Sequence, residues 1–185
     1  MSERFESFYS GSSQNMRRSA IREILKLTQK PGMISFAGGL PAPDSFPIED
    51  VKKIAVEVLD EQGKAALQYG TTEGDNRLRK ALADRHTRQG VKVTPENIVI
   101  TTGSQQALDL IGKIFINPVD HIICGLPSYL GGLNAFTVYG AKLRGIPLDN
   151  NGMRPDLLEK AIIGLKEQGE KIKFHSSLVS GVPDY

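Results

Sequence analysis

Short apolar runs alternate with helical patterns in the second half of the chain, and this alternation limits the possible fold more than any other feature. The runs Ile98-Val-Ile-Thr101 and Ile122-Ile123 are typical of buried strands. Residues 105–115, between them, carry apolar side chains at helical spacing. Strands and helices that alternate in this way form a largely parallel sheet with helices on both faces.

The same pattern continues toward the end of the sequence. It predicts a helix over 128–139, a strand over 142–147 and another strand over 171–179. Between these two strands Pro155 opens a further helix, because proline is favoured at the first helical position. We therefore expect the α/β fold class, with a mostly parallel sheet preceded by a helical N-terminal segment.

Helices are predicted in the section before the sheet. Apolar residues at helical spacing indicate a helix that starts near Val51 and is capped by Gly63. Thr72 and Asp75 have the spacing of a capping box and predict a second helix that runs to Gly90. These patterns divide the chain into three sections, which are an arm, helix and loop (1–47), a helical segment (48–93) and the sheet section (94–185).

Composition narrows the class of protein. Hydrophobic residues make up 39% of the chain and charged residues 24%, which indicates a soluble globular protein. A net charge of +2 gives no reason to expect nucleic acid or a membrane surface as a partner. The single Cys124 excludes an internal disulfide and is interpreted as a buried core residue. Without a signal peptide or a membrane-spanning run in view, we expect a cytoplasmic location.

The stretch Gly103-Ser104-Gln105 lies between a predicted strand and a predicted helix. Glycine lets a ligand approach the backbone closely, and Ser104 and Gln105 place polar groups at a helix N-terminus. The unsatisfied amides and partial positive charge of such an end suit a phosphate. The same residues also fit an ordinary turn with a helix cap, so the motif alone leaves both interpretations open.

A second motif, Pro127-Ser128-Tyr129, follows the next predicted strand. It falls at the same carboxyl edge of the sheet, where ligands of open α/β proteins bind. The ring of Tyr129 could stack on a planar heterocycle there. A tyrosine that packs against its own helix is the alternative, and two such loops on successive strands are more informative than either one.

With these motifs in place, the chain resembles the fold-type I pyridoxal-phosphate (PLP) aminotransferases of class I/II, and most of all the 2-aminoadipate and kynurenine/aminoadipate aminotransferases. The resemblance covers nearly the whole sequence in order. The segments that carry it are residues 21–27, 34–41, 67–69, 100–109 and 127–131.

The resemblance implies PLP as cofactor, an amino acid and a 2-oxo acid as substrates, and amino transfer between them. Gly103, Ser104 and Gln105 would hold the cofactor phosphate, and Tyr129 would stack on the pyridine ring. Tyr69 resembles a tyrosine that reaches the phosphate of the neighbouring subunit, which implies a homodimer.

The resemblance also implies substrate contacts. Gly38 and Gly39 resemble the loop that lines the substrate pocket. Arg22 resembles an arginine that meets the distal carboxylate of acidic substrates, a task suited to a bidentate guanidinium. A tight loop and a solvated helix residue are the respective alternatives.

The last residues resemble the point where relatives continue into Gln-Asn-Pro-x-Gly. We therefore expect that the Schiff-base lysine, its partner asparagine and aspartate, and the carboxylate-binding arginine are not in this chain, which has no catalytic residue and is inactive alone. Lys113, Lys142 and Lys173 are interpreted as surface charges. Gly125 stands where relatives commonly carry an acidic residue. A regulatory or non-catalytic PLP-binding module is the alternative, although residues 1–32 are too short for a helix-turn-helix domain.

Overall fold

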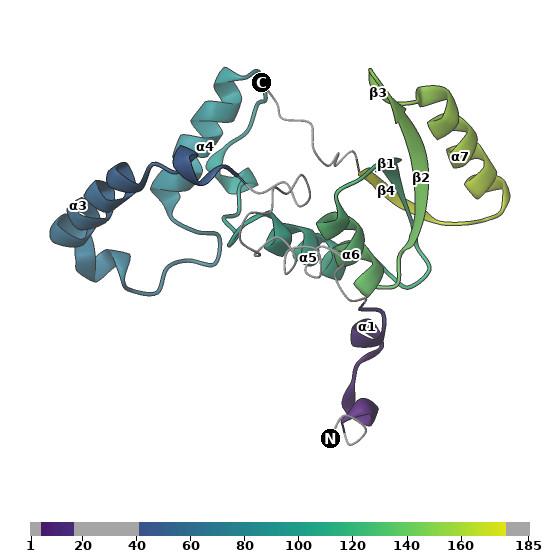
Figure 1. Ribbon diagram of the computed structural model, residues 1–185, viewed down its shortest axis with the longest axis horizontal. Helices are drawn as coiled ribbons and strands as arrows, with labels where there is room; N and C mark the ends of the chain where they lie inside the picture. Colours follow the sequence, from purple (N-terminus) through teal and green to yellow (C-terminus); the bar gives the residue numbers. More distant parts are fainter. Residues whose placement is uncertain (1–4, 17–40, 177–185) are drawn as a thin grey trace, which may run out of the picture. The chain divides into compact units, whose positions relative to one another are not determined.

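The computed structural model describes residues 5–16 and 41–176 (Figure 1). The chain folds as two compact units, of which one is formed by residues 36–101 and the other by residues 1–35 together with 102–185. Arg22, Gly38 and Gly39 lie outside the described residues, as does the helix expected between Ile21 and the break at Pro31.

The unit that contains residues 102–185 is built on a four-stranded sheet in the order β3-β2-β1-β4. Strand β1 lies between β2 and β4 and is parallel to both, whereas the short β3 runs antiparallel to β2. The prediction of a mostly parallel sheet is confirmed. The strands are β1 (His121–Leu126), β2 (Lys142–Asp149), β3 (Gly152–Met153) and β4 (Ile172–Ser176).

Helices cover both faces of this sheet (Figure 1). Alternate residues of a strand point to opposite faces, so the fully buried Ile122 and Ile123 of β1 belong to different cores. Ile122 packs with residues of α6 (Leu130–Val138) and with Leu108 of α5 (Ser104–Phe115). Ile123 packs with residues of α7 (Pro155–Glu167), which begins at proline as predicted.

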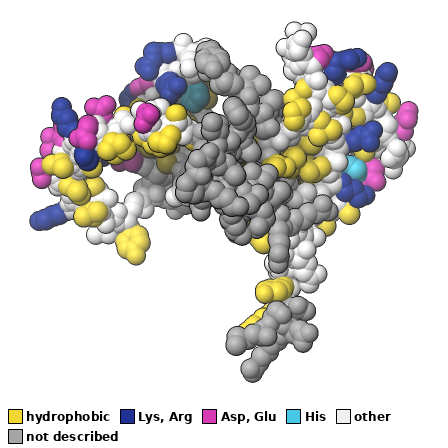
Figure 2. Space-filling view, in the orientation of Figure 1, with side chains coloured by type: hydrophobic (Ala, Val, Ile, Leu, Met, Phe, Trp, Pro, Cys, Tyr) yellow, Lys and Arg dark blue, Asp and Glu magenta, His cyan; other side chains and the backbone are white. Residues whose placement is uncertain are grey.

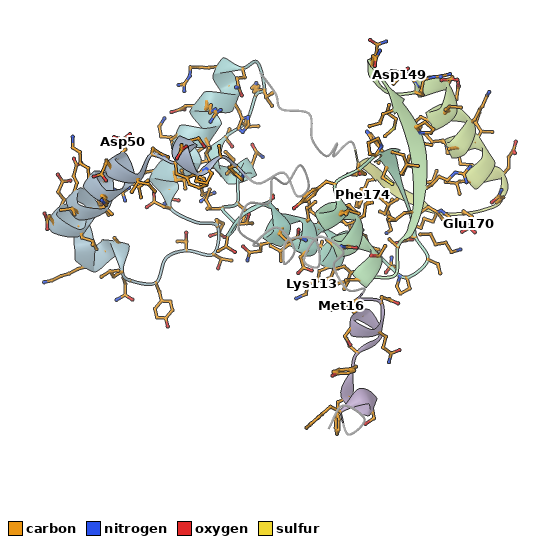
Figure 3. All side chains as sticks on the ribbon, in the orientation of Figure 1. Met16, Asp50, Lys113, Asp149, Glu170 and Phe174 are labelled. Atoms are coloured by element: carbon orange, nitrogen blue, oxygen red, sulfur yellow. The ribbon has the colours of Figure 1, made fainter. Side chains whose placement is uncertain are left out.

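An aromatic pair joins α6 to the edge strand β4. The rings of Phe136 and Phe174 lie 5.3 Å apart at 77°, an edge-to-face arrangement (Phe174 is labelled in Figure 3). Such a pair contributes about 0.5–1.5 kcal/mol beyond the burial of its area. It fixes the sheet against the helix that follows β1.

Charged residues lie at the amino end of β1, the end opposite Tyr129. Buried Asp120 accepts a hydrogen bond from Asn117 N (2.7 Å) and lies 3.4 Å from Lys173 Nζ. Burial would raise the pKa of Asp120, but the Asn117 amide and the Lys173 ammonium outweigh it and lower this pKa. Glu170 lies 3.4 Å from His121 Nε2 and 3.6 Å from Lys142 Nζ (Figure 3). Lys142 and Lys173 are therefore members of ion pairs rather than isolated surface charges.

The described residues of the unit formed by residues 36–101 include two long helices, α3 (Ile48–Ala66) and α4 (Asn76–Arg88), and two short 3-10 helices (Pro43–Ser45 and Pro95–Asn97). Gly63 does not cap α3, because the helix continues to Ala66 after a break at Gln62, whose φ is −143°. The predicted capping box is also wrong. Asp75 itself is the N-cap of α4, because its carboxylate reaches the first amides of the helix while Thr71 and Thr72 belong to the preceding turn.

Residues 98–101 form no strand, although their apolar run predicts one. A strand needs a paired neighbour, and none of the described strands pairs with this segment. Two of its hydrogen bonds are made to residues of its own unit. Ile100 N donates to Glu73 O (2.9 Å), and Arg79 Nε donates to Ile98 O (3.0 Å). Val99 is 59% exposed. The residue types favour a strand, but among the described residues the segment has neither the burial nor the paired neighbour that a strand needs.

The apolar face of α3 is exposed in the part of the chain that the structure describes. Val51, Ile54 and Leu59 are each more than half exposed. Figure 2 shows hydrophobic side chains along this helix beside Lys, Arg, Asp and Glu side chains. Within residues 5–16 and 41–176, no helix combines the length and hydrophobicity needed to cross a membrane.

Candidate functional site

Helix α5 begins at a glycine that provides no side-chain cap. Gly103 has φ 94° and ψ 166°, a conformation that favours glycine over residues with a side chain. A Cβ atom at this position would meet nothing within 4 Å, so the space beside the turn is open. Ser104 and Gln105, the first two residues of the helix, are exposed. The N-cap residue therefore has no side chain that would occupy the amides of this first turn.

The turn before α5 is held from inside the helix. Gln106 Oε1 accepts hydrogen bonds from Thr102 N (2.6 Å) and from Thr102 Oγ1 (3.0 Å). Gln106 is the third residue of α5, and Thr102 precedes the N-cap glycine. The two bonds therefore span the turn that contains Gly103.

Tyr129 lies beside the same helix end. It is the N-cap residue of α6, three residues beyond the end of β1, and its side chain is partly exposed. Gln105 Nε2 donates to Gly131 O (3.2 Å), which joins the first turns of α5 and α6. The structure thus brings Gln105 and Tyr129 together, at the carboxyl end of β1.

Gly131 provides the space in which these two side chains meet. A Cβ atom at residue 131 would lie 2.5 Å from Tyr129 Cε1 and 2.6 Å from Gln105 Oε1. Both distances are far below van der Waals contact. The tyrosine ring and the glutamine carboxamide can lie side by side only because residue 131 has no side chain.

A third contact holds α5 against α6. Tyr139 Oη donates to Asp109 Oδ1 (3.0 Å), and the Tyr139 ring lies against Gly112, where a Cβ would be 2.6 Å from Cδ2. Burial, and then the hydrogen bond to Asp109, raise the pKa of the Tyr139 phenol. The phenol is therefore a donor at neutral pH and fixes the direction of α5.

Tyr69 and Cys124 were also singled out in the sequence. Tyr69 belongs to the unit formed by residues 36–101, follows α3 and is fully exposed. Cys124 is buried, and burial raises the pKa of its thiol, which agrees with a core residue rather than a nucleophile. Among the described residues, no group of His, Cys, Asp and Glu side chains could hold a metal ion.

Sequence reasoning missed Gln106, Gly131 and Tyr139. Gln106 and Gly131 lie inside the motifs that were recognised, but their roles depend on contacts between residues up to 26 positions apart. A glutamine at the third position of a helix that begins with glycine is a signal that could have been used, because that position commonly reaches back to the cap.

A helix start whose N-cap residue supplies no side-chain cap, beside an aromatic ring at the carboxyl end of a parallel strand, places the described residues in the class of open α/β proteins, which bind ligands at this edge of the sheet and anions at helix N-termini. Comparison with known proteins specifies this class further. The chain belongs to the class I and II aminotransferase family, whose sequence profile matches residues 31–178.

Individual relatives agree with this assignment. The chain is 46% identical over 170 residues to an aromatic-amino-acid aminotransferase of Thermococcus litoralis, a match that covers 91% of this chain and 41% of the relative. A kynurenine aminotransferase of Pyrococcus horikoshii, solved in complex with PMP, is 44% identical with a TM-score of 0.83 and is matched over 92% of this chain and 42% of its own.

The α-aminoadipate aminotransferase of Thermus thermophilus, solved with N-(5'-phosphopyridoxyl)-L-leucine, is 34% identical with a TM-score of 0.78. The match covers 96% of this chain and 44% of that structure. The chain thus spans about two fifths of the length of these relatives.

Proposed function

We propose that this chain supplies the phosphate- and ring-binding part of a PLP-dependent aminotransferase. The observation that carries the proposal is the joint placement of the uncapped first turn of α5 and the Tyr129 ring, bridged by the bond from Gln105 Nε2 to Gly131 O. Family membership supports PLP as the ligand of this place.

The residues present fit the two ends of this cofactor. A phosphate dianion is matched by helix amides, the Ser104 hydroxyl and the positive end of α5. A flat aromatic ring is matched by the partly exposed face of Tyr129. When bound, PLP supplies an electron sink for the removal of a proton from an amino acid. The task of this chain's residues is to bind and orient it.

The proposal also assigns contacts to residues outside α5 and α6. Tyr69 would bind the phosphate held by a second subunit, for which its complete exposure leaves the side chain available, so the active protein would be a homodimer. Arg22 would bind the distal carboxylate of an acidic substrate, and Gly38 and Gly39 would line the pocket. The substrates would be an amino acid, of the acidic or aromatic kind named for the relatives, and a 2-oxo acid. The single, buried Cys124 supports a cytoplasmic location.

Binding is tested by titrating the ¹⁵N-labelled chain with PLP and, separately, with pyridoxal, which has the same ring and no phosphate. We expect PLP to bind at least about tenfold more tightly, because charge-assisted hydrogen bonds contribute roughly 1.5–3 kcal/mol each. The amide signals of Gly103, Ser104 and Gln105 should shift with PLP only. Equal affinities, or shifts confined to other residues, would contradict the proposal.

Activity is tested on the product of the complete gene. We expect it to transfer an amino group from an amino acid to a 2-oxo acid in the presence of PLP, while the 185-residue chain alone shows no transfer. A complete product that binds PLP and specific DNA, but transfers no amino group, would favour the regulatory alternative.

A further inference from the structure

We infer that Gln106 is the positioning residue of the phosphate-binding turn, an inference that rests on the proposed function. Its carboxamide oxygen holds Thr102, and through it the Gly103 turn, in the conformation that leaves the first amides of α5 to a phosphate. Gln106 itself does not need to touch the ligand.

The turn needs such a constraint because its central residue is glycine. Gly103 has φ 94°, and a Cβ there would have no neighbour within 4 Å. Glycine loses more conformational freedom on ordering than any other residue, so an unsupported turn of this kind would sample several conformations. The amides of Ser104 and Gln105 would then be aimed at the phosphate only part of the time.

Gln106 supplies the constraint with one atom. Its Oε1 accepts from both the amide (2.6 Å) and the hydroxyl (3.0 Å) of Thr102, so the residue before the glycine is tied at two points. Side chains of a helix lean toward its N-terminus, which allows the third residue to reach back past the cap. The bonds go to Thr102 and not to the amides of the helix itself, and the N-cap Gly103 supplies no side-chain cap to those amides. The turn is therefore fixed without filling the place of the ligand.

The chain contains a matched control in a turn that has no proposed ligand. Asn97 Oδ1 accepts from Thr94 N (3.0 Å) and from Thr94 Oγ1 (3.1 Å), the same pair of bonds from one side-chain oxygen to one threonine. Asn97 is also the third residue of its short 3-10 helix (Pro95–Asn97). Removal of either acceptor should loosen its own turn, but only removal of Gln106 should alter ligand binding.

The experiment compares Gln106→Met with Asn97→Leu, which keep side-chain size and remove the acceptor oxygen. Three quantities are measured on each chain, namely hydrogen exchange of the threonine amide, affinity for PLP and affinity for pyridoxal. In Gln106→Met we expect exchange at Thr102 to rise about tenfold and PLP affinity to fall about tenfold, as for the loss of hydrogen bonds of ordinary strength. Pyridoxal affinity should stay within about twofold, because the ring contacts are kept. In Asn97→Leu only exchange at Thr94 should rise.

The outcomes separate this inference from the proposed function. A PLP preference that survives in Gln106→Met would overturn the inference and leave the proposed function intact. An equal fall in PLP and pyridoxal affinity would also overturn it, because Gln106 would then support the fold in general. A wild-type chain without any preference for PLP over pyridoxal would overturn the proposed function, and the inference with it.

Discussion

Helices α4 and α5 begin in opposite ways. The first amides of α4 are capped by the Asp75 carboxylate, which accepts from Arg77 N (2.9 Å) and Leu78 N (3.1 Å). The first turn of α5 begins at Gly103, which supplies no side-chain cap, and the preceding Thr102 is bonded to Gln106. One helix start carries its own anion, and the other has the geometry to accept one.

The difference shows how a sequence can mark a ligand site by what it omits. An acidic or hydroxyl cap stabilises a helix and also occupies the amides that a phosphate would use. An aspartate at position 103 could cap α5 in the way that Asp75 caps α4. Gly103 in that place leaves the turn less stable and leaves the positive helix end available.

The largest effect is expected from Gly103→Asp, which gives α5 the cap that α4 has. The new carboxylate would occupy the first amides and repel the phosphate, and like charges placed together cost several kcal/mol. PLP affinity should fall about a hundredfold or more while pyridoxal affinity changes little, since about 1.4 kcal/mol corresponds to a factor of ten. Parallel titrations with the two ligands measure the effect.

Gly90→Asp is the control for the strain that this substitution brings. Gly90 has φ 88° and, like Gly103, no neighbour within 4 Å of a built Cβ. Both substitutions therefore place an aspartate at a positive φ, which residues with a side chain rarely adopt. A similar loss of PLP affinity in Gly90→Asp would show that strain, and not the filled helix start, is responsible.

A smaller loss is expected from Gly131→Ala, which disturbs the site without altering the helix start. The new methyl group would push away the Tyr129 ring and the Gln105 carboxamide, the two groups that lie within 2.6 Å of it. Both are the ends of flexible side chains, so the fold should survive and the affinity for PLP should fall about tenfold, as for one hydrogen bond plus part of a stacking contact.

Gly164→Ala is its matched control. Gly164 lies inside α7, and a Cβ there would meet nothing within 4 Å. Alanine in a helix interior is favoured over glycine by about 1 kcal/mol, so this variant should unfold at higher denaturant concentration and bind PLP like the wild type. Loss of binding in both variants would contradict the role given to the space at residue 131.

Buried elements could be predicted from the sequence more closely than helix ends could. Elements whose patterns report burial were predicted within a few residues, as for β1 with Ile122 and Ile123 and for α7 with Pro155 at its start. Residues 98–101 show the limit, because an apolar run states that a segment can be a strand but not that a neighbour pairs with it. The start of α4 was misplaced because an N-cap depends on which side chain reaches the amides, as Asp75 does. The end of α3 was misplaced because the helix continues beyond Gly63 after the break at Gln62.

The candidate residues of the site were identified from the sequence, but the hydrogen bonds that join them were not. Gly103, Ser104, Gln105 and Tyr129 come from motifs that can be recognised along the chain, and their roles remain predictions that the titrations test. The bond from Gln105 to Gly131 and the bonds from Thr102 to Gln106 follow only when the helices are in place. The spacing of apolar residues predicts which face of a helix or strand is buried. It does not predict which side-chain atoms form hydrogen bonds once the elements are packed.

A more modest effect is expected from Tyr129→Leu, which removes the stacking ring and keeps an apolar side chain. Aromatic contacts contribute about 0.5–1.5 kcal/mol beyond burial, so the affinities for PLP and for pyridoxal should both fall about fivefold. The ratio of the two affinities should stay constant, in contrast to Gly103→Asp. A fall for PLP alone would mean that Tyr129 contacts the phosphate and not the ring.

Asp75→Asn, at the capped start of α4, is expected to have no effect on PLP binding. The Arg77 guanidinium, and then the Leu78 amide, lower the pKa of Asp75 below its ordinary value of 3.8. A carboxylate whose pKa is lower in the folded state stabilises the fold above its unfolded pKa and loses this contribution as the pH falls through the folded value. Wild type should therefore resist urea better than Asp75→Asn at pH 7, and the difference should shrink below about pH 4.

The PLP preference of the two chains should be the same at neutral pH. A stability difference that does not change with pH would show that the cap acts through hydrogen bonding alone and not through its charge.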